Sequence, residues 1–181
     1  MQSKTSGYIF LVLFALSIPL ANWMIGNFGT FCVPDGPCLI PVAPGITAPS
    51  GVLMVGAALV LRDLVQRSLG FKWALGAVLA GAALSGLVAP PALVFASATA
   101  FLLSEMADLA VYTPLQEKGL TKAVVASSVV GLVVDSIVFL YLAFGSLDYI
   151  SGQIIGKMWM VLLAIPIIKY LRSMEQKNLA E

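Results

Sequence analysis

Residues 104–146 read SEMADLAVYTPLQEKGLTKAVVASSVVGLVVDSIVFLYLAFGS, and this stretch decides how the rest of the chain is interpreted. It contains two long apolar runs joined by a short charged turn. Glu105 and Asp108 lie in the first run, and Asp135 lies near the middle of the second. A carboxylate at membrane depth is strongly unfavourable unless it faces a paired or hydrated interior. We therefore expect these three acids to mark a functional site inside a membrane protein.

The composition supports that expectation. Of the 181 residues, 60% are hydrophobic and 10% are charged, and the mean hydropathy is +0.98. An ordinary soluble domain is about one quarter charged. The net charge of +1 and the lack of a dense basic cluster argue against a nucleic-acid partner. The sequence has no histidine, no metal-spaced ligand set, no nucleophile–base set and no phosphate-binding loop. We therefore expect no metal, no cofactor and no enzymatic activity.

Six apolar segments are long enough to be candidates for membrane-spanning helices: residues 7–26, 50–66, 73–88, 92–112, 123–144 and 150–170. Solid apolar runs favour helices over the strands of a barrel, which would alternate. We predict an all-α integral membrane protein, in which residues 1–181 form one bundle of six transmembrane helices with an outer loop at 27–49. The alternative for the first run is a cleaved signal peptide, but the run is long and lacks a clear cleavage site.

The basic residues predict the orientation of this bundle. Lysine and arginine occur before the first apolar segment, between the second and third, between the fourth and fifth, and at the end of the chain. The other connections contain neither lysine nor arginine, and their only charged residues are Asp35 and Asp148. By the positive-inside rule, both termini are then cytoplasmic, in a plasma (inner) membrane. The basic residues that set this pattern are Lys4, Arg67, Lys72, Lys118, Lys122, Lys169, Arg172 and Lys177.

The two cysteines, Cys32 and Cys38, both lie in the outer loop within the sequence CVPDGPC. Their location and the turn-rich spacer permit a disulfide in an oxidising compartment. Two unpaired loop thiols are the alternative, and two cysteines alone make a poor metal site.

Three of the predicted helices each present one polar stripe at helical spacing. The stripes are Phe101, Glu105 and Asp108 on the fourth segment, Ser128, Gly131 and Asp135 on the fifth, and Gln153 and Lys157 on the sixth. We expect them to face a shared central cavity, with Asp135 near the midplane and Glu105 and Asp108 closer to the cytoplasm.

Structural roles are the alternatives for these charges. Arg62 could extend to the inner headgroups while Asp63 pairs with Arg67 one turn on. Arg62 and Glu105 could be a buried pair that only orients helices. Lys157 could neutralise Asp135 or extend outward. Gly131 is better explained as a close-packing site than as a ligand contact.

Four blocks of the chain resemble the VUT family, the queuosine-precursor transporters, in the same order as in that family. They are PSGVLMVGAALVLRDLVQRSLG (49–70), SEMADLAVYTPLQEKG (104–119), SSVVGLVVDSIVFLYLAFGSL (127–147) and GQIIGKMWM (152–160). The short chain is similar to compact members from actinobacteria and their phages. The resemblance implies a six-helix importer of a 7-deazaguanine such as preQ0, preQ1 or queuine.

The chemistry of such a nucleobase agrees with the residues at hand. Its ring N–H and exocyclic amine form a donor fork that a carboxylate accepts in bidentate fashion. We expect Asp135 or Glu105 to hold this edge, with Asp135 the better candidate. We expect Arg62, Asp108 or Lys157 to bind the carbonyl group of the base or to set the charge balance of the site. We expect the ring of the base to stack on an aromatic side chain. The remaining expected substrate contacts are Gln153, Ser128, Phe101, Phe139 and Trp159, and the expected packing or gating residues are Asp63, Arg67 and Gly131.

Two further functions compete with this one. A substrate-binding subunit of an energy-coupling-factor importer is also a small six-helix protein, and it would need coupling subunits as partners. A holin-like pore protein would have fewer spans and no deep acids. A homodimer is also plausible, because six helices leave a broad lipid-facing surface; the remaining expected partners are the nucleobase and the bilayer.

Overall fold

The computed structural model describes residues 4–34, 36–89 and 91–178. Asp35 and Pro90, which belong to two of the predicted connecting segments, lie outside these ranges. The described residues form six α-helices, as the apolar runs predict: α1 (Lys4–Asn27), α2 (Val52–Leu69), α3 (Phe71–Val88), α4 (Val94–Leu115), α5 (Leu120–Phe144) and α6 (Ile150–Asn178). A single 3-10 turn, Pro91–Leu93, leads into α4.

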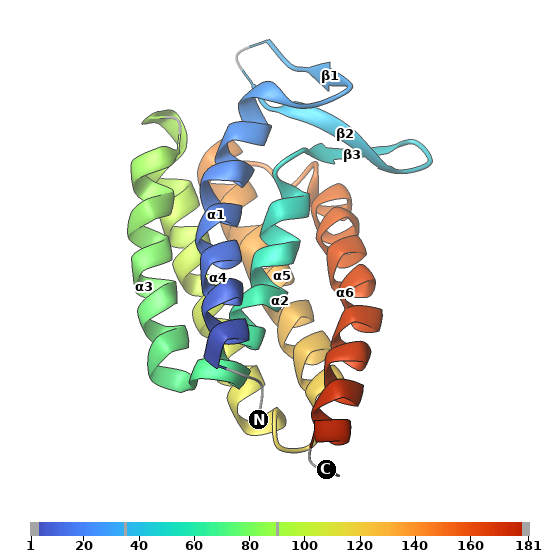
Figure 1. Ribbon diagram of the computed structural model, residues 1–181. Coiled ribbons are helices and arrows are strands. Elements are labelled where there is room, and N and C mark those ends of the chain that lie inside the picture. Colours follow the sequence, from blue (N-terminus) through green and yellow to red (C-terminus); the bar gives the residue numbers. More distant parts are fainter. Residues whose placement is uncertain (1–3, 35, 90, 179–181) are drawn as a thin grey trace.

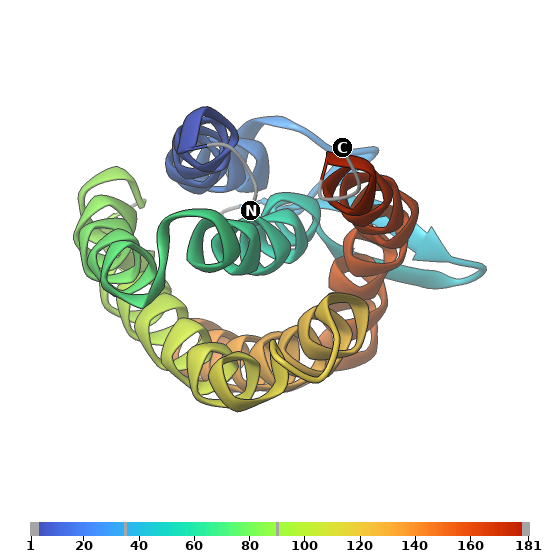
Figure 2. The ribbon, with the colours of Figure 1, turned by 60° about the horizontal axis from the view of Figure 1, so that its bottom comes forward.

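Five of the six helices are long and apolar enough to cross a membrane, and α2 is the exception. Its 18 residues include Arg62, Asp63 and Arg67. Figure 2 shows why such a helix is tolerated: α2 lies at the centre, with the other helices arranged around it. Arg62 and Asp63 are fully buried against the neighbouring helices and are therefore shielded from the outside of the bundle.

The segment predicted as an irregular outer loop contains a small sheet instead. Strands β1 (Phe31–Cys32), β2 (Cys38–Ala43) and β3 (Ile46–Pro49) pair antiparallel in the order β1-β2-β3. The apolar residues Ile40, Val42 and Ala48 pack on α2 and α6 through Val52 and Ile155. The sheet therefore covers one end of the bundle, while α1 begins and α6 ends at the opposite end (Figure 1).

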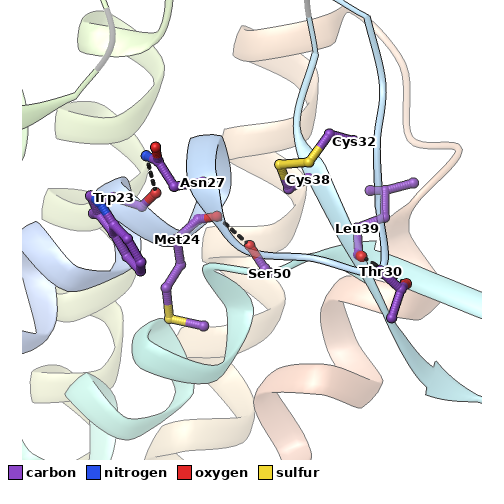
Figure 3. The surroundings of a disulfide bond; sticks show 8 residues. All are labelled: Trp23, Met24, Asn27, Thr30, Cys32, Cys38, Leu39 and Ser50. Atoms are coloured by element: carbon purple, nitrogen blue, oxygen red, sulfur yellow. Dashed lines mark hydrogen bonds between the residues drawn. A yellow bond between two sulfur atoms is a disulfide. The ribbon is translucent and has the colours of Figure 1, made fainter.

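Cys32 and Cys38 form a disulfide that joins β1 to the start of β2. Figure 3 shows this bond beside the end of α1. Ser50, just after β3, donates a hydrogen bond to the Met24 carbonyl oxygen of α1 at 2.7 Å. The disulfide thus holds β1 on β2 within the sheet, and Ser50 attaches the end of β3 to α1.

Two apolar clusters hold the helices together. One lies among α2, α4, α5 and α6, and it includes Leu59, Tyr112, Leu132 and Val161. The other lies among α1, α2, α3 and α4, and it includes Phe14, Ala58, Ala77 and Phe101.

Large apolar side chains also cover the outside of the bundle, for example Leu16, Leu87, Phe95, Tyr141 and Leu163. An apolar exterior around a polar centre is the arrangement that a bilayer favours.

The backbones of α2 and α6 approach each other closely at Gly56. A Cβ atom at this position would lie 2.5 Å from the carbonyl oxygen of Lys157. Only glycine lets α2 and α6 pack this closely, as small residues do in membrane bundles. This packing fixes α6 in the position from which its lysine reaches the interior.

Candidate functional site

Arg62 is the centre of a buried charge cluster that joins α2 to α4. Its Nε donates a hydrogen bond to Glu105 Oε2 at 3.1 Å. Its Nη1 lies 2.7 Å from Asp63 Oδ1, and its Nη2 lies 2.8 Å from Asp108 Oδ1. The arginine is 0% exposed, which contradicts the alternative that it extends to the headgroups. One guanidinium thus contacts three carboxylates.

Neighbouring polar side chains extend this cluster to α5 and toward the turn between α4 and α5. Ser127 of α5 donates to Asp63 Oδ2 at 2.8 Å. Gln66 accepts a hydrogen bond from Arg62 and donates one to Thr113 Oγ1 at 3.1 Å. The guanidinium also lies over the ring of Tyr112, 5.8 Å from its centroid, at a distance suited to a cation–π contact. Three helices are therefore locked together around one cation.

A second buried pair joins α6 to α5. Lys157 Nζ donates to Asp135 Oδ2 at 2.6 Å and to Ser136 Oγ at 2.8 Å. The Ser136 hydroxyl in turn donates to the Leu132 carbonyl oxygen at 2.6 Å. The lysine side chain is 1% exposed and the aspartate side chain 10%. Lys157 thus neutralises Asp135, one of the alternatives above, while the carboxylate keeps access to open space.

That open space is a cavity between the two charge clusters. It is lined by side chains of all six helices, and Glu105 and Asp135 lie on its wall. Phe101, Phe139 and Gln153 also line it, together with Pro49 and Gly51 below the sheet. Most of the remaining wall is apolar. Two carboxylates on an apolar wall with two aromatic rings can hold a flat molecule that has donors along one edge.

The cavity offers about 80 Å³ behind a wall that is apolar except for a few polar side chains. Clefts of this character take small ligands and orient them through a few polar contacts.

The structure brings together only part of the predicted site. Five predicted contacts line the cavity: Glu105, Asp135, Phe101, Phe139 and Gln153. Arg62, Asp108 and Lys157 do not line it: Arg62 contacts Glu105, Lys157 contacts Asp135, and Asp108 contacts Arg62.

Four other predicted residues lie elsewhere. Ser128 is fully buried in the bundle, and Gly131 packs against Leu59 and Asp108. Arg67 is exposed near the end of α2. Trp159 is 50% exposed, and its indole N–H donates to the Val42 carbonyl oxygen of β2 at 2.9 Å. The tryptophan therefore holds the sheet on α6 and does not reach the cavity.

Several polar side chains of the site were not predicted as contacts. Ser127 and Ser136 are partners of the buried charges, as described above. Five others line the cavity: Ser17, Asn22, Ser85, Ser97 and Ser104. Spacing places Ser97 and Ser104 close to the helix face that carries Glu105, although they were not predicted as contacts. Ser17, Asn22 and Ser85 lie on apolar helices without a charged neighbour, so the sequence offers no signal for them.

The acids are not arranged as a metal site. Within the described residues, no group of three or more histidine, cysteine or acidic side chains is placed to hold a metal ion. The three carboxylates on α2 and α4 converge on the guanidinium of Arg62, which occupies the position that an ion would need.

A comparison with known protein families gave one match. Residues 86–171 match the family described as "putative vitamin uptake transporter". This segment is just under half of the chain, and it contains Glu105, Asp108, Asp135 and Lys157 but not α2. Neither a curated protein nor a solved structure gave a match.

Proposed function

We propose that this chain, whose residues 86–171 match the vitamin uptake transporter model, belongs to the VUT family and imports a 7-deazaguanine precursor of queuosine. The observation that carries the proposal is the cavity with Asp135 and Glu105 on its wall. Asp135 gives one oxygen to Lys157 and keeps some exposure to the cavity, so its carboxylate is available to a donor fork. A bidentate contact of this kind is strong and directional.

The other lining residues suit the remaining surface of such a base. Phe101 and Phe139 come from α4 and α5, and either ring offers a face for stacking. Gln153 of α6 offers an amide that can donate to the ring carbonyl or accept from a ring N–H. The second carboxylate, Glu105, reaches the same space from α4. Its hydrogen bond from Arg62 fixes the orientation of its side chain.

We further propose that α2 is a sixth membrane span and that both termini are cytoplasmic. With 18 residues, α2 is about 27 Å long, close to the ~30 Å thickness of the hydrocarbon layer. The lysine and arginine residues of the connections lie at the end where α1 begins, and the disulfide lies at the other end. A basic cytoplasmic face and an oxidised outer face give the same orientation in the plasma membrane.

Binding and uptake measurements test this proposal. Purified protein is titrated with preQ0, preQ1, queuine and guanine, and uptake is measured in a host that lacks its own transporter. We expect Asp135→Asn and Glu105→Gln to lose uptake, and the exposed Asp148→Asn to keep it. Full transport by both cavity variants would refute the assignment of the site.

The same measurements separate the competing functions. Tight binding without uptake by this chain alone would favour a substrate-binding subunit that needs coupling partners. Leakage of unrelated solutes without saturable binding would favour a pore. A homodimer is tested by the mass of the protein in detergent.

A further inference from the structure

The charge cluster on α2 and α4 contains more acid than base. Arg62 is its only cation among the described contacts, and it faces Asp63, Glu105 and Asp108. If all three acids were ionised, two negative charges would remain uncompensated in a buried site. Isolated buried charges are strongly unfavourable, and such groups usually take up a proton instead.

Asp108 is the member of the cluster with a free oxygen. It is fully buried, and its Oδ1 faces Arg62. Its Oδ2 has no hydrogen-bond or ion-pair partner within the described residues. The side chain is enclosed by α5 at Gly131, where an added Cβ would lie 3.4 Å from Asp108 Oδ2.

Two further buried hydroxyls lie on the same two helices. Tyr112 is one turn further along α4, and Ser128 is one turn before Gly131 on α5. Both residues are 0% exposed, and neither hydroxyl has a hydrogen-bond partner among the described residues. A buried carboxylate oxygen that receives no hydrogen bond is strongly unfavourable as an anion, and protonation removes that charge. The surroundings therefore suit a neutral Asp108.

The groups that face Asp108 come from every helix packed around it. From α2 they are Arg62 and Asp63, from α4 Glu105, and from α5 Ser127. Asp135 and Lys157 form a separate ion pair between α5 and α6. The guanidinium occupies the centre of the cluster, so a proton fits this site where a metal ion does not.

We propose that Asp108 binds a proton that enters the cell together with the substrate. Glu105 links the two events, because it lines the cavity and shares Arg62 with Asp108. A second N–H donor of the substrate that contacts Glu105 requires it as a carboxylate. That charge is favoured when its neighbour Asp108, one turn along α4, is neutral. Substrate binding and protonation of Asp108 therefore support each other, which is the condition for symport.

This inference rests on the proposed function, so the experiment separates the two. Purified protein is reconstituted into liposomes, and two activities are measured with radiolabelled preQ0. The first is exchange of internal for external preQ0 without a gradient, which needs only binding and translocation. The second is accumulation of preQ0 driven by a pH gradient, acid outside. For one proton per substrate, a gradient of one pH unit supports about tenfold accumulation.

The variant Asp108→Asn fixes the residue in a neutral form. We expect it to keep exchange and to lose accumulation driven by the pH gradient, while Asp148→Asn keeps both. Asp108→Ser, a smaller neutral side chain, is expected to behave like Asp108→Asn. Both variants are first shown to be folded by a single symmetric peak in size-exclusion chromatography.

Three outcomes overturn the inference. Exchange by the wild type without any accumulation under a pH gradient would show that no proton is coupled. Accumulation retained by Asp108→Asn would place the proton elsewhere. Loss of exchange in both folded variants would show that Asp108 does not act through its neutral form. Absence of wild-type exchange would instead refute the proposed function, and the inference with it.

Discussion

The pair of Lys157 and Asp135 allows a double-mutant cycle with an expected order of effects. Lys157→Met removes the only described cation within ion-pair distance of Asp135. Asp135→Asn removes the charge that lies 2.6 Å from Lys157 Nζ. Breaking a buried pair by removing one partner costs about 3–5 kcal/mol, whereas neutralising both is often harmless.

The structure predicts which single substitution lowers the free energy of unfolding more. Asp135 borders the cavity and its side chain is 10% exposed, so water there can solvate it after Lys157→Met. Lys157 is 1% exposed and has no such access after Asp135→Asn. We therefore expect losses of about 3 kcal/mol for Lys157→Met and about 5 kcal/mol for Asp135→Asn, the two ends of the measured range.

The assay is equilibrium unfolding of the protein in detergent. We expect the double variant to lose only about 2 kcal/mol, because neutralising both partners leaves no unpaired buried charge. Set against the two single losses, this corresponds to a coupling energy of about 6 kcal/mol. In a chain of this size, 3 kcal/mol corresponds to a shift of about 6–12 °C in Tm. Lys169→Met, at an exposed position on the same helix, is the matched control and should change little. Additive losses, or a greater loss for Lys157→Met, would refute this reasoning.

Three further predictions follow from single contacts. Gly56→Ala places a Cβ 2.5 Å from a backbone carbonyl oxygen of α6 and should cost about 1–3 kcal/mol in the same unfolding assay; Gly76→Ala, with open space around it, should be close to neutral, and equal effects would contradict the close packing. Cys32→Ser opens the short disulfide loop to Cys38 and should lower stability by about 2 kcal/mol; an unchanged unfolding midpoint with and without reductant would argue against the bond. Phe139→Ala removes one stacking surface and should weaken preQ0 binding about tenfold, as measured by titration, for an aromatic contact worth about 1.5 kcal/mol; unaltered affinity would exclude this ring from the binding site.

Helical spacing explains which aromatic residues could be predicted. Phe101 is four residues before Glu105, and Phe139 is four residues after Asp135, so each shares a face with its acid and lines the cavity. Trp159 is only two residues after Lys157, which places it on nearly the opposite side of α6. Its exposure and its bond to the sheet are consistent with that angle. Applied strictly, the same spacing rule would have excluded Trp159 from the site.

The sheet and the cluster around Arg62 were harder to predict. The segment between the first two helices is rich in proline and glycine and has no clear alternation, so its strands gave little signal. The pairing of Arg62 with Glu105 could be offered only as an alternative, because it depends on how α2 and α4 pack. The helices themselves were predictable because their apolar runs are long and uninterrupted.

The central position of α2 also has a consequence for the biosynthesis of the protein. On the scale measured for insertion by the translocon, an arginine or aspartate at the centre of a helix is unfavourable by about 3 kcal/mol. Glu105 follows Arg62 by 43 residues, so the arginine is synthesised well before its partners on α4. We expect a nascent chain that ends after α3 to leave α2 poorly integrated, and α2 to enter the bilayer stably only once α4 has emerged. The polar centre of the finished bundle would then set the order in which its helices are assembled.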